Sequence, residues 1–266
     1  MAEFQMQQVP EENPESFLAR MQPLISKSVS AEITETLNEA LSFLPPGGLE
    51  TGFTGKASAY IEASFKGKIF PASGDPNFVI RADASLLKPS SQEGATGADL
   101  AIYFEVLYKL PPPYNILRSK TLLVQAKTGN INEQDELKCS NPDLRKQITM
   151  IERISPNDGF LLVFTPGAGY CVDIQDAIAG LNGSTLTTKA FHPAGEMIGR
   201  LVSCSAGNTA AISPKTLRVK RAPTGRIFLD DANEKLKNYG NSTLQAPFSK
   251  PKDAVLITLE IKKKNP

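Results

Sequence analysis

The sequence predicts an α/β fold, in which a mixed central β-sheet is flanked by helices. Segments with strand composition alternate with a helical one, and a further apolar strand, AVLITLEIK, lies near the carboxyl end. The strand segments are 100–108, 121–127, 159–165 and 170–174, and the helix carries Leu144, Gln147, Ile148 and Ile151 behind a possible cap at Asp143. With 266 residues, 41% of them hydrophobic, the chain can form one large domain over 1–266.

The amino-terminal region has helical periodicity over residues 14–44. Because proline lacks an N–H group, we expect Pro23 to bend or end a first piece, and Ser30 to cap a second. Farther along, 59–65 and 78–84 are predicted as strands, and helices are predicted near 195–204 and 230–238.

Composition excludes several classes of site. The chain has one histidine, His192, so a multi-histidine metal site cannot form within it. Its three cysteines, an odd number at wide spacing, indicate neither a disulfide framework nor a compact zinc site. No apolar run is long enough for a membrane span, and the first residues are acidic and polar, so we expect a cytoplasmic protein without membrane association.

The net charge of +1 is unevenly distributed. Residues 1–50 hold eight acids and two bases, and the remainder is therefore basic. Five bases fall within twelve residues without an intervening acid: Lys215, Arg218, Lys220, Arg221 and Arg226. Such a cluster suits contacts with nucleic-acid phosphates, and a solvated basic surface is the alternative interpretation.

The segments 100–108 and 121–127 are predicted to form an antiparallel hairpin, each with one apolar and one polar face. If the midpoint lies near Pro113, Asp99 is opposite Lys127, with Gln125 on the same face. These groups suit phosphodiester hydrolysis. Asp99, the Gln125 amide and the Ala126 carbonyl can hold a divalent ion, and Lys127 can orient water or stabilise the transition state.

Glu93, in the loop before Asp99, could add a second carboxylate to this group. The alternative interpretation is an ordinary polar face with a surface Asp-Lys pair. A nucleotide-binding Walker motif is absent from the Gly-rich segments.

The segment Glu93-Gly94-Ala95-Thr96-Gly97-Ala98-Asp99, followed by Gln125-Ala126-Lys127, resembles the core motif of the PD-(D/E)XK, or restriction-endonuclease-like, nuclease superfamily. It is most similar to the bacterial defence-associated branch with a Thr-Gly-Ala-Asp element and a Gln-Ala-Lys strand. The helix around Glu32 and Glu35 resembles the leading helix of that branch, and the helix with Gln147 resembles the one after the catalytic strand. The resemblance covers about residues 30–180, leaving 181–266 as a carboxyl-terminal elaboration.

This resemblance implies a Mg²⁺-dependent deoxyribonuclease, with Mn²⁺ as a possible substitute. It implies catalytic roles for Asp99, Gln125, Lys127 and Glu93, and makes Glu35 a further candidate metal ligand. Gln125 departs from the pattern, since many members have a carboxylate there. DNA as substrate, a homodimer and partner proteins of a defence system are expected by analogy. The alternative is a weakly active or inactive nuclease-like fold that binds nucleic acid or protein.

Overall fold

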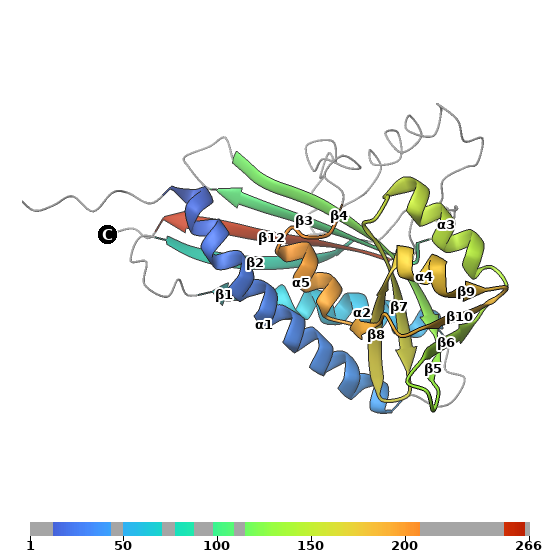
Figure 1. The fold of residues 1–266 in the computed structure, drawn as a ribbon. Helices are drawn as coiled ribbons and strands as arrows, with labels where there is room; N and C mark the ends of the chain where they lie inside the picture. Colours follow the sequence, from blue (N-terminus) through green and yellow to red (C-terminus); the bar gives the residue numbers. More distant parts are fainter. Residues whose placement is uncertain are drawn as a thin grey trace, which may run out of the picture.

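The computed structural model describes residues 13–43, 50–70, 78–87, 98–108, 115–207 and 253–263. These residues form a mixed α/β fold around an eight-stranded sheet of order β1-β2-β12-β3-β4-β7-β8-β11, beside a four-stranded sheet of order β5-β6-β10-β9 (Figure 1). The predicted α/β class is therefore confirmed. The helix predicted near 230–238 lies outside the described residues.

Helix α1 (Pro14–Ser42) is continuous, so the predicted break at Pro23 and cap at Ser30 are wrong. Asn13 caps the helix by accepting a hydrogen bond from the backbone of Ser16. Pro23 is exposed, so the helical carbonyl that it cannot bond faces water. A single apolar stripe continues past the proline and packs against the sheet, which keeps the helix continuous through it. The stripe comprises Phe17, Leu18, Met21, Ile25, Val29, Ile33, Leu37 and Leu41.

The segment 59–65, predicted as a strand, belongs to helix α2 (Glu50–Phe65). Its buried apolar residues Ala57, Ile61 and Phe65 recur every four residues, which is helical spacing. The prediction failed because the aromatic and β-branched residues of this segment also suit a strand. The segment 78–84 is correctly predicted within β2 (Phe78–Leu87), which pairs with the short strand β1 (Ile69–Phe70).

The predicted hairpin consists of β3 (Leu100–Tyr108) and β4 (Asn115–Thr128), paired antiparallel with a β-bulge after Val106. Strand β7 (Gly159–Thr165) runs parallel to β4 and is followed by β8 (Ala168–Asp173). The terminal strand β12 (Asp253–Lys263) lies between β2 and β3. A segment assigned to the carboxyl-terminal elaboration is thus a central strand of the sheet.

The remaining elements surround the β4–β7–β8 half of the sheet. Helix α3 (Leu144–Ile154) connects β4 to β7, and Asp143 occupies its N-cap position without a side-chain cap hydrogen bond. The others are β5 (Asn130–Ile131), β6 (Leu137–Ser140), α4 (Ile174–Gly180), β9 (Leu181–Asn182), β10 (Thr185–Thr188), β11 (His192–Pro193) and α5 (Glu196–Val202).

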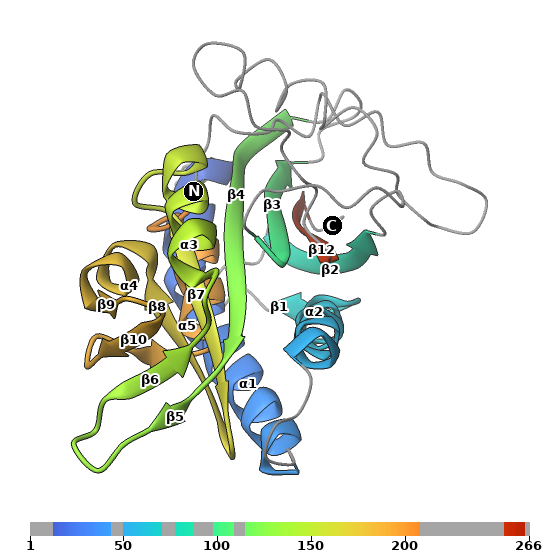
Figure 2. The ribbon, with the colours of Figure 1, turned by 90° about the vertical axis from the view of Figure 1, so that its right-hand side faces the viewer.

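Helices cover both faces of the main sheet (Figure 2). On one face α1, α2 and α5 pack against a core that includes Ile102, Phe104 and Val124. On the other, α3 and α4 pack against a second core that includes Ala101 and Leu123. The polar side chains Asp99, Gln125 and Lys127 at this end of the hairpin are therefore buried, because α3 covers the face of the sheet on which they lie.

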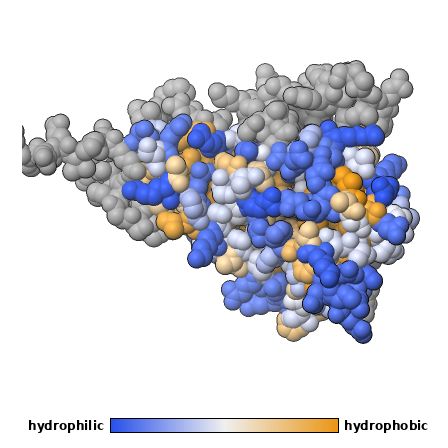
Figure 3. All heavy atoms as spheres, viewed as in Figure 1, coloured by the Kyte–Doolittle hydropathy of each residue, from blue (hydrophilic) through white to orange (hydrophobic). Residues whose placement is uncertain are grey.

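The outer surface in the view of Figure 3 carries mainly hydrophilic residues with scattered apolar ones. None of the helices in the described ranges combines the length and the apolar character that crossing a membrane requires.

The close packing of α3 on the sheet can be tested by a substitution at Gly159. A Cβ atom added there would lie 2.3 Å from Cγ2 of Ile151. We expect Gly159→Ala to lower the free energy of unfolding by about 1–3 kcal/mol in urea titrations. Gly52→Ala is the control, since no atom lies within 4 Å of the added Cβ in α2. It should raise stability by up to about 1 kcal/mol. Equal effects would contradict this packing.

Candidate active site

The Asp99 carboxylate is held at the end of the hairpin by groups of β4. Its Oδ2 accepts hydrogen bonds from Nε2 of Gln125 and, at 3.1 Å, from the backbone N–H of Ala126. The Asp99 backbone N–H donates to the carbonyl of Val124 at 2.9 Å. Asp99 is 5% exposed and Gln125 1%. The carboxylate is thus fixed in a dry environment, where electrostatic interactions are stronger than in water.

The hairpin register differs from the expected one by two residues. Leu100 pairs with Val124, which places Asp99 opposite Gln125 rather than opposite Lys127. The assumed midpoint near Pro113 was wrong by one residue, because β4 begins at Asn115, earlier than predicted, which moves the midpoint of the connection toward β3. A shift of two residues preserves the face of each side chain, so Asp99, Gln125 and Lys127 still share one face.

Lys127 lies two residues beyond Gln125 on β4 and is 3% exposed. In an antiparallel pair this makes it the diagonal neighbour of Asp99, a position about 7–8 Å away. Buried charges are stable in proteins when they have partners of opposite charge or hydrogen bonds. The site thus brings a buried carboxylate and a buried ammonium group to one face of the sheet.

The oxygen atoms proposed as metal ligands converge. Nε2 of Gln125 donates both to Oδ2 of Asp99 and, at 3.1 Å, to the carbonyl of Ala126. Both oxygens therefore lie within reach of one point, where a cation could replace the amino group. One carboxylate and neutral oxygens suit Mg²⁺, which usually retains several water ligands. These residues therefore fit a divalent ion, although the described residues contain no group of three His, Cys, Asp or Glu side chains arranged to bind one.

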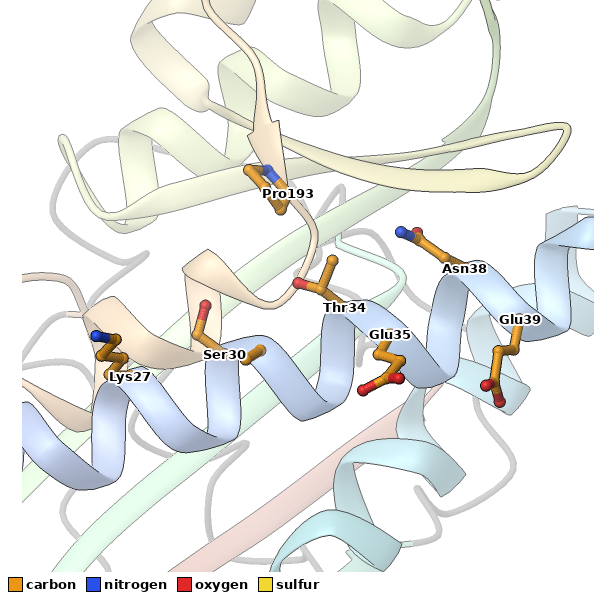
Figure 4. A pocket seen from close by; sticks show the side chains of 8 residues that line it. Lys27, Ser30, Thr34, Glu35, Asn38, Glu39 and Pro193 are labelled. Atoms are coloured by element: carbon orange, nitrogen blue, oxygen red, sulfur yellow. The ribbon is translucent and has the colours of Figure 1, made fainter.

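The structure does not bring Glu35 to this site. Glu35 is exposed on α1, whose buried residues pack on the opposite face of the sheet from Gln125. It lines a shallow pocket of about 720 Å³ with other α1 residues and Pro193 (Figure 4). As a ligand for an ion held by Asp99, Glu35 is therefore a wrong prediction, since the sheet separates the two side chains.

Several predicted site residues lie outside the described residues. These are Glu93 and the basic cluster of Lys215, Arg218, Lys220, Arg221 and Arg226. Their roles in metal and nucleic-acid binding stay predictions.

Strand β12 also supports Asp99, which was not predicted from the sequence. The backbone N–H of Asp253 donates to the carbonyl of Asp99 at 3.0 Å, where β12 begins its parallel pairing with β3. The signal was available in the sequence, because AVLITLEIK is rich in the β-branched and apolar residues of central strands. Its partner strand could not be identified from composition.

Comparisons with known proteins supply no family for this chain. Protein-family models, curated proteins and solved structures gave no match.

The pairing of Asp99 with β4 can be tested through stability. We expect Asp99→Ala to lower the free energy of unfolding by about 1–3 kcal/mol, because the N–H groups of Gln125 and Ala126 lose a buried acceptor. The measurement is urea denaturation without metal. Asp143→Ala is the matched control, since Asp143 is exposed and makes no cap hydrogen bond. A loss no larger than that of the control would contradict the assigned hydrogen bonds.

Proposed function

We propose that this protein is a Mg²⁺-dependent deoxyribonuclease with a restriction-endonuclease-like core, acting in the cytoplasm in bacterial defence or DNA processing. The observation that supports it most is the convergence of Asp99, Gln125, the Ala126 carbonyl and Lys127 on one face of the β3–β4 hairpin. The resemblance of these residues to the superfamily motif supports the same function independently of their geometry.

In the proposed reaction, water attacks the phosphorus of a phosphodiester, a new P–O bond forms and the bond to the leaving oxygen breaks. The leaving oxygen receives a proton, giving a phosphomonoester and a hydroxyl group. A bound Mg²⁺ would neutralise phosphate charge and help to activate the water. Asp99 and the Ala126 carbonyl would hold the ion, while the Lys127 ammonium group would stabilise negative charge on the phosphate.

Gln125 has two possible orientations toward the ligand oxygens. As it lies, its amino group donates to Asp99 and to the Ala126 carbonyl. Turned end for end, the amide would present its carbonyl oxygen to the same point. In this proposal the amino group satisfies Asp99 in the metal-free protein, and the amide oxygen would serve as a ligand when the ion is bound.

A second candidate function is DNA or protein binding without cleavage. It is favoured by the neutral Gln125, which stands where many members of the superfamily have a carboxylate. For the nuclease function, the homodimer expected by analogy would supply two active sites, one for each strand of duplex DNA. Proteins of a defence system remain candidate partners.

Plasmid cleavage with and without Mg²⁺ or Mn²⁺ separates these functions. We expect metal-dependent cutting by the parent and a loss of at least about 100-fold in Asp99→Asn and Lys127→Met, which remove charge while keeping side-chain size. The exposed Lys146 of α3 provides the control Lys146→Met, which should retain activity.

Cutting that survives both site substitutions would exclude this site. DNA binding without cutting, measured across varied DNA substrates, would favour the second function.

A further inference from the structure

Helix α3 covers the sheet face that carries Asp99, Gln125 and Lys127. Its buried residues Leu144, Ile148 and Ile151 form the stripe that packs on this face. Gln147 lies beside that stripe and is half-buried. The function proposed above assigns no role to this side chain.

Gln147 lies at the level of the candidate active site along the sheet. Ile151 packs against Gly159, and Gly159 pairs with Leu123 of β4. Because the end of α3, at Ile151, packs beside Gly159 at the start of β7, α3 runs antiparallel to β7 and to the parallel strand β4. Four residues of helix rise about 6 Å and two residues of strand about 6.6 Å. Gln147 precedes Ile151 by about one helical turn, and Gln125 follows Leu123 by two residues. The two glutamines therefore lie at the same level along the sheet.

The rotation of α3 turns Gln147 toward Asp99. The guanidinium group of Arg145 donates to the carbonyl of Leu181 at 2.9 Å, so this flank of α3 faces α4 and β9. Two residues later in a helix, a side chain points about 160° away from that direction. Gln147 thus lies on the flank toward β4 and β3, in agreement with Figure 2, where α3 lies between α4 and β4.

The carboxamide oxygen of Gln147 is buried without a hydrogen-bond partner among the described residues. Leaving a buried acceptor unsatisfied costs about 1–3 kcal/mol, so such groups in folded proteins call for an explanation. A hydrogen-bond donor that enters the site with the substrate would explain this unsatisfied oxygen. The acceptor would then be costly in the free protein and satisfied in the complex.

We propose that Gln147 is a further residue of the active site, whose Oε1 accepts a hydrogen bond from the water that attacks the phosphodiester. This inference rests on the proposed nuclease function. An attacking water needs an acceptor for its O–H while its lone pair faces phosphorus, and the Lys127 ammonium group has no acceptor atom. In the proposed site the Asp99 carboxylate would be engaged as a ligand of the ion. Gln147 supplies a neutral acceptor at the same level of the sheet.

Gln147→Leu tests this role, since leucine fills similar space without the acceptor. We expect Mg²⁺-dependent plasmid cleavage to fall about tenfold or more. The melting temperature of the metal-free and DNA-free protein should stay unchanged or rise, because a buried unsatisfied group has been removed. Gln147→Glu retains an acceptor and should cut faster than Gln147→Leu. Gln134→Leu, in the exposed turn between β5 and β6, is the matched control and should cut like the parent.

Cleavage by Gln147→Leu at the parent rate would overturn this inference and leave the proposed function intact. A fall in both melting temperature and cleavage, with no recovery in Gln147→Glu, would also overturn it, since Gln147 would then be structural. A parent protein that does not cut DNA would remove the proposed function, and the inference with it.

Discussion

The fold and the candidate site depend on the hydrogen bonds that the Asp99 carboxylate accepts from β4. Gln125 and the Ala126 backbone both donate to Oδ2 of Asp99, and β12 donates to the Asp99 carbonyl from the other side. Three neighbouring strands are therefore joined around one residue just before β3 begins. Because Asp99 is buried, moving it away would leave the Ala126 N–H without this acceptor and remove one of the two acceptors of the Gln125 amide, which makes the register at this end of the hairpin costly to change.

Because both faces of the sheet are buried, the charged and polar groups of the candidate site lie in surroundings from which water is largely excluded. The apolar core under α1 and α2 excludes water from one face, and α3 covers the other. Charges in such surroundings interact more strongly than in water, which favours binding of an ion or a phosphate group. The same burial makes every unmatched polar group expensive. The oxygen of Gln147, which has no hydrogen-bond partner within the described part of the chain, is an example near the site, and a bound ligand that donates to it would offset that cost.

The sequence predicted the parts of the fold that follow from local periodicity. Strands at 100–108 and 159–165 and the terminal strand were predicted because β-branched and aromatic residues, in which these segments are rich, are enriched in strands. The helix at 50–65 was missed because its apolar residues suit both structures. The break at Pro23 was predicted from the missing N–H, yet packing of the whole stripe outweighs one lost hydrogen bond.

For the site, alternation along each strand sufficed to place Asp99, Gln125 and Lys127 on one face. The residue opposite Asp99 could not be predicted, because it depends on the bulge after Val106 and on the length of β4. Position in the sequence also gave no indication that the sheet separates Glu35 from Asp99, or that α3 turns Gln147 toward the site. Both are consequences of how helices pack on the sheet, which no local pattern specifies.

The central claim is that the oxygens of Asp99 and Ala126 bind a divalent ion. Crystals grown with Mn²⁺ test it directly through an anomalous difference map, which locates manganese without regard to activity. We expect a peak between the Asp99 carboxylate and the Ala126 carbonyl, with the Gln125 amide oxygen turned toward it, and no such peak in Asp99→Asn. Manganese bound elsewhere, or none at this position at millimolar Mn²⁺, would contradict it.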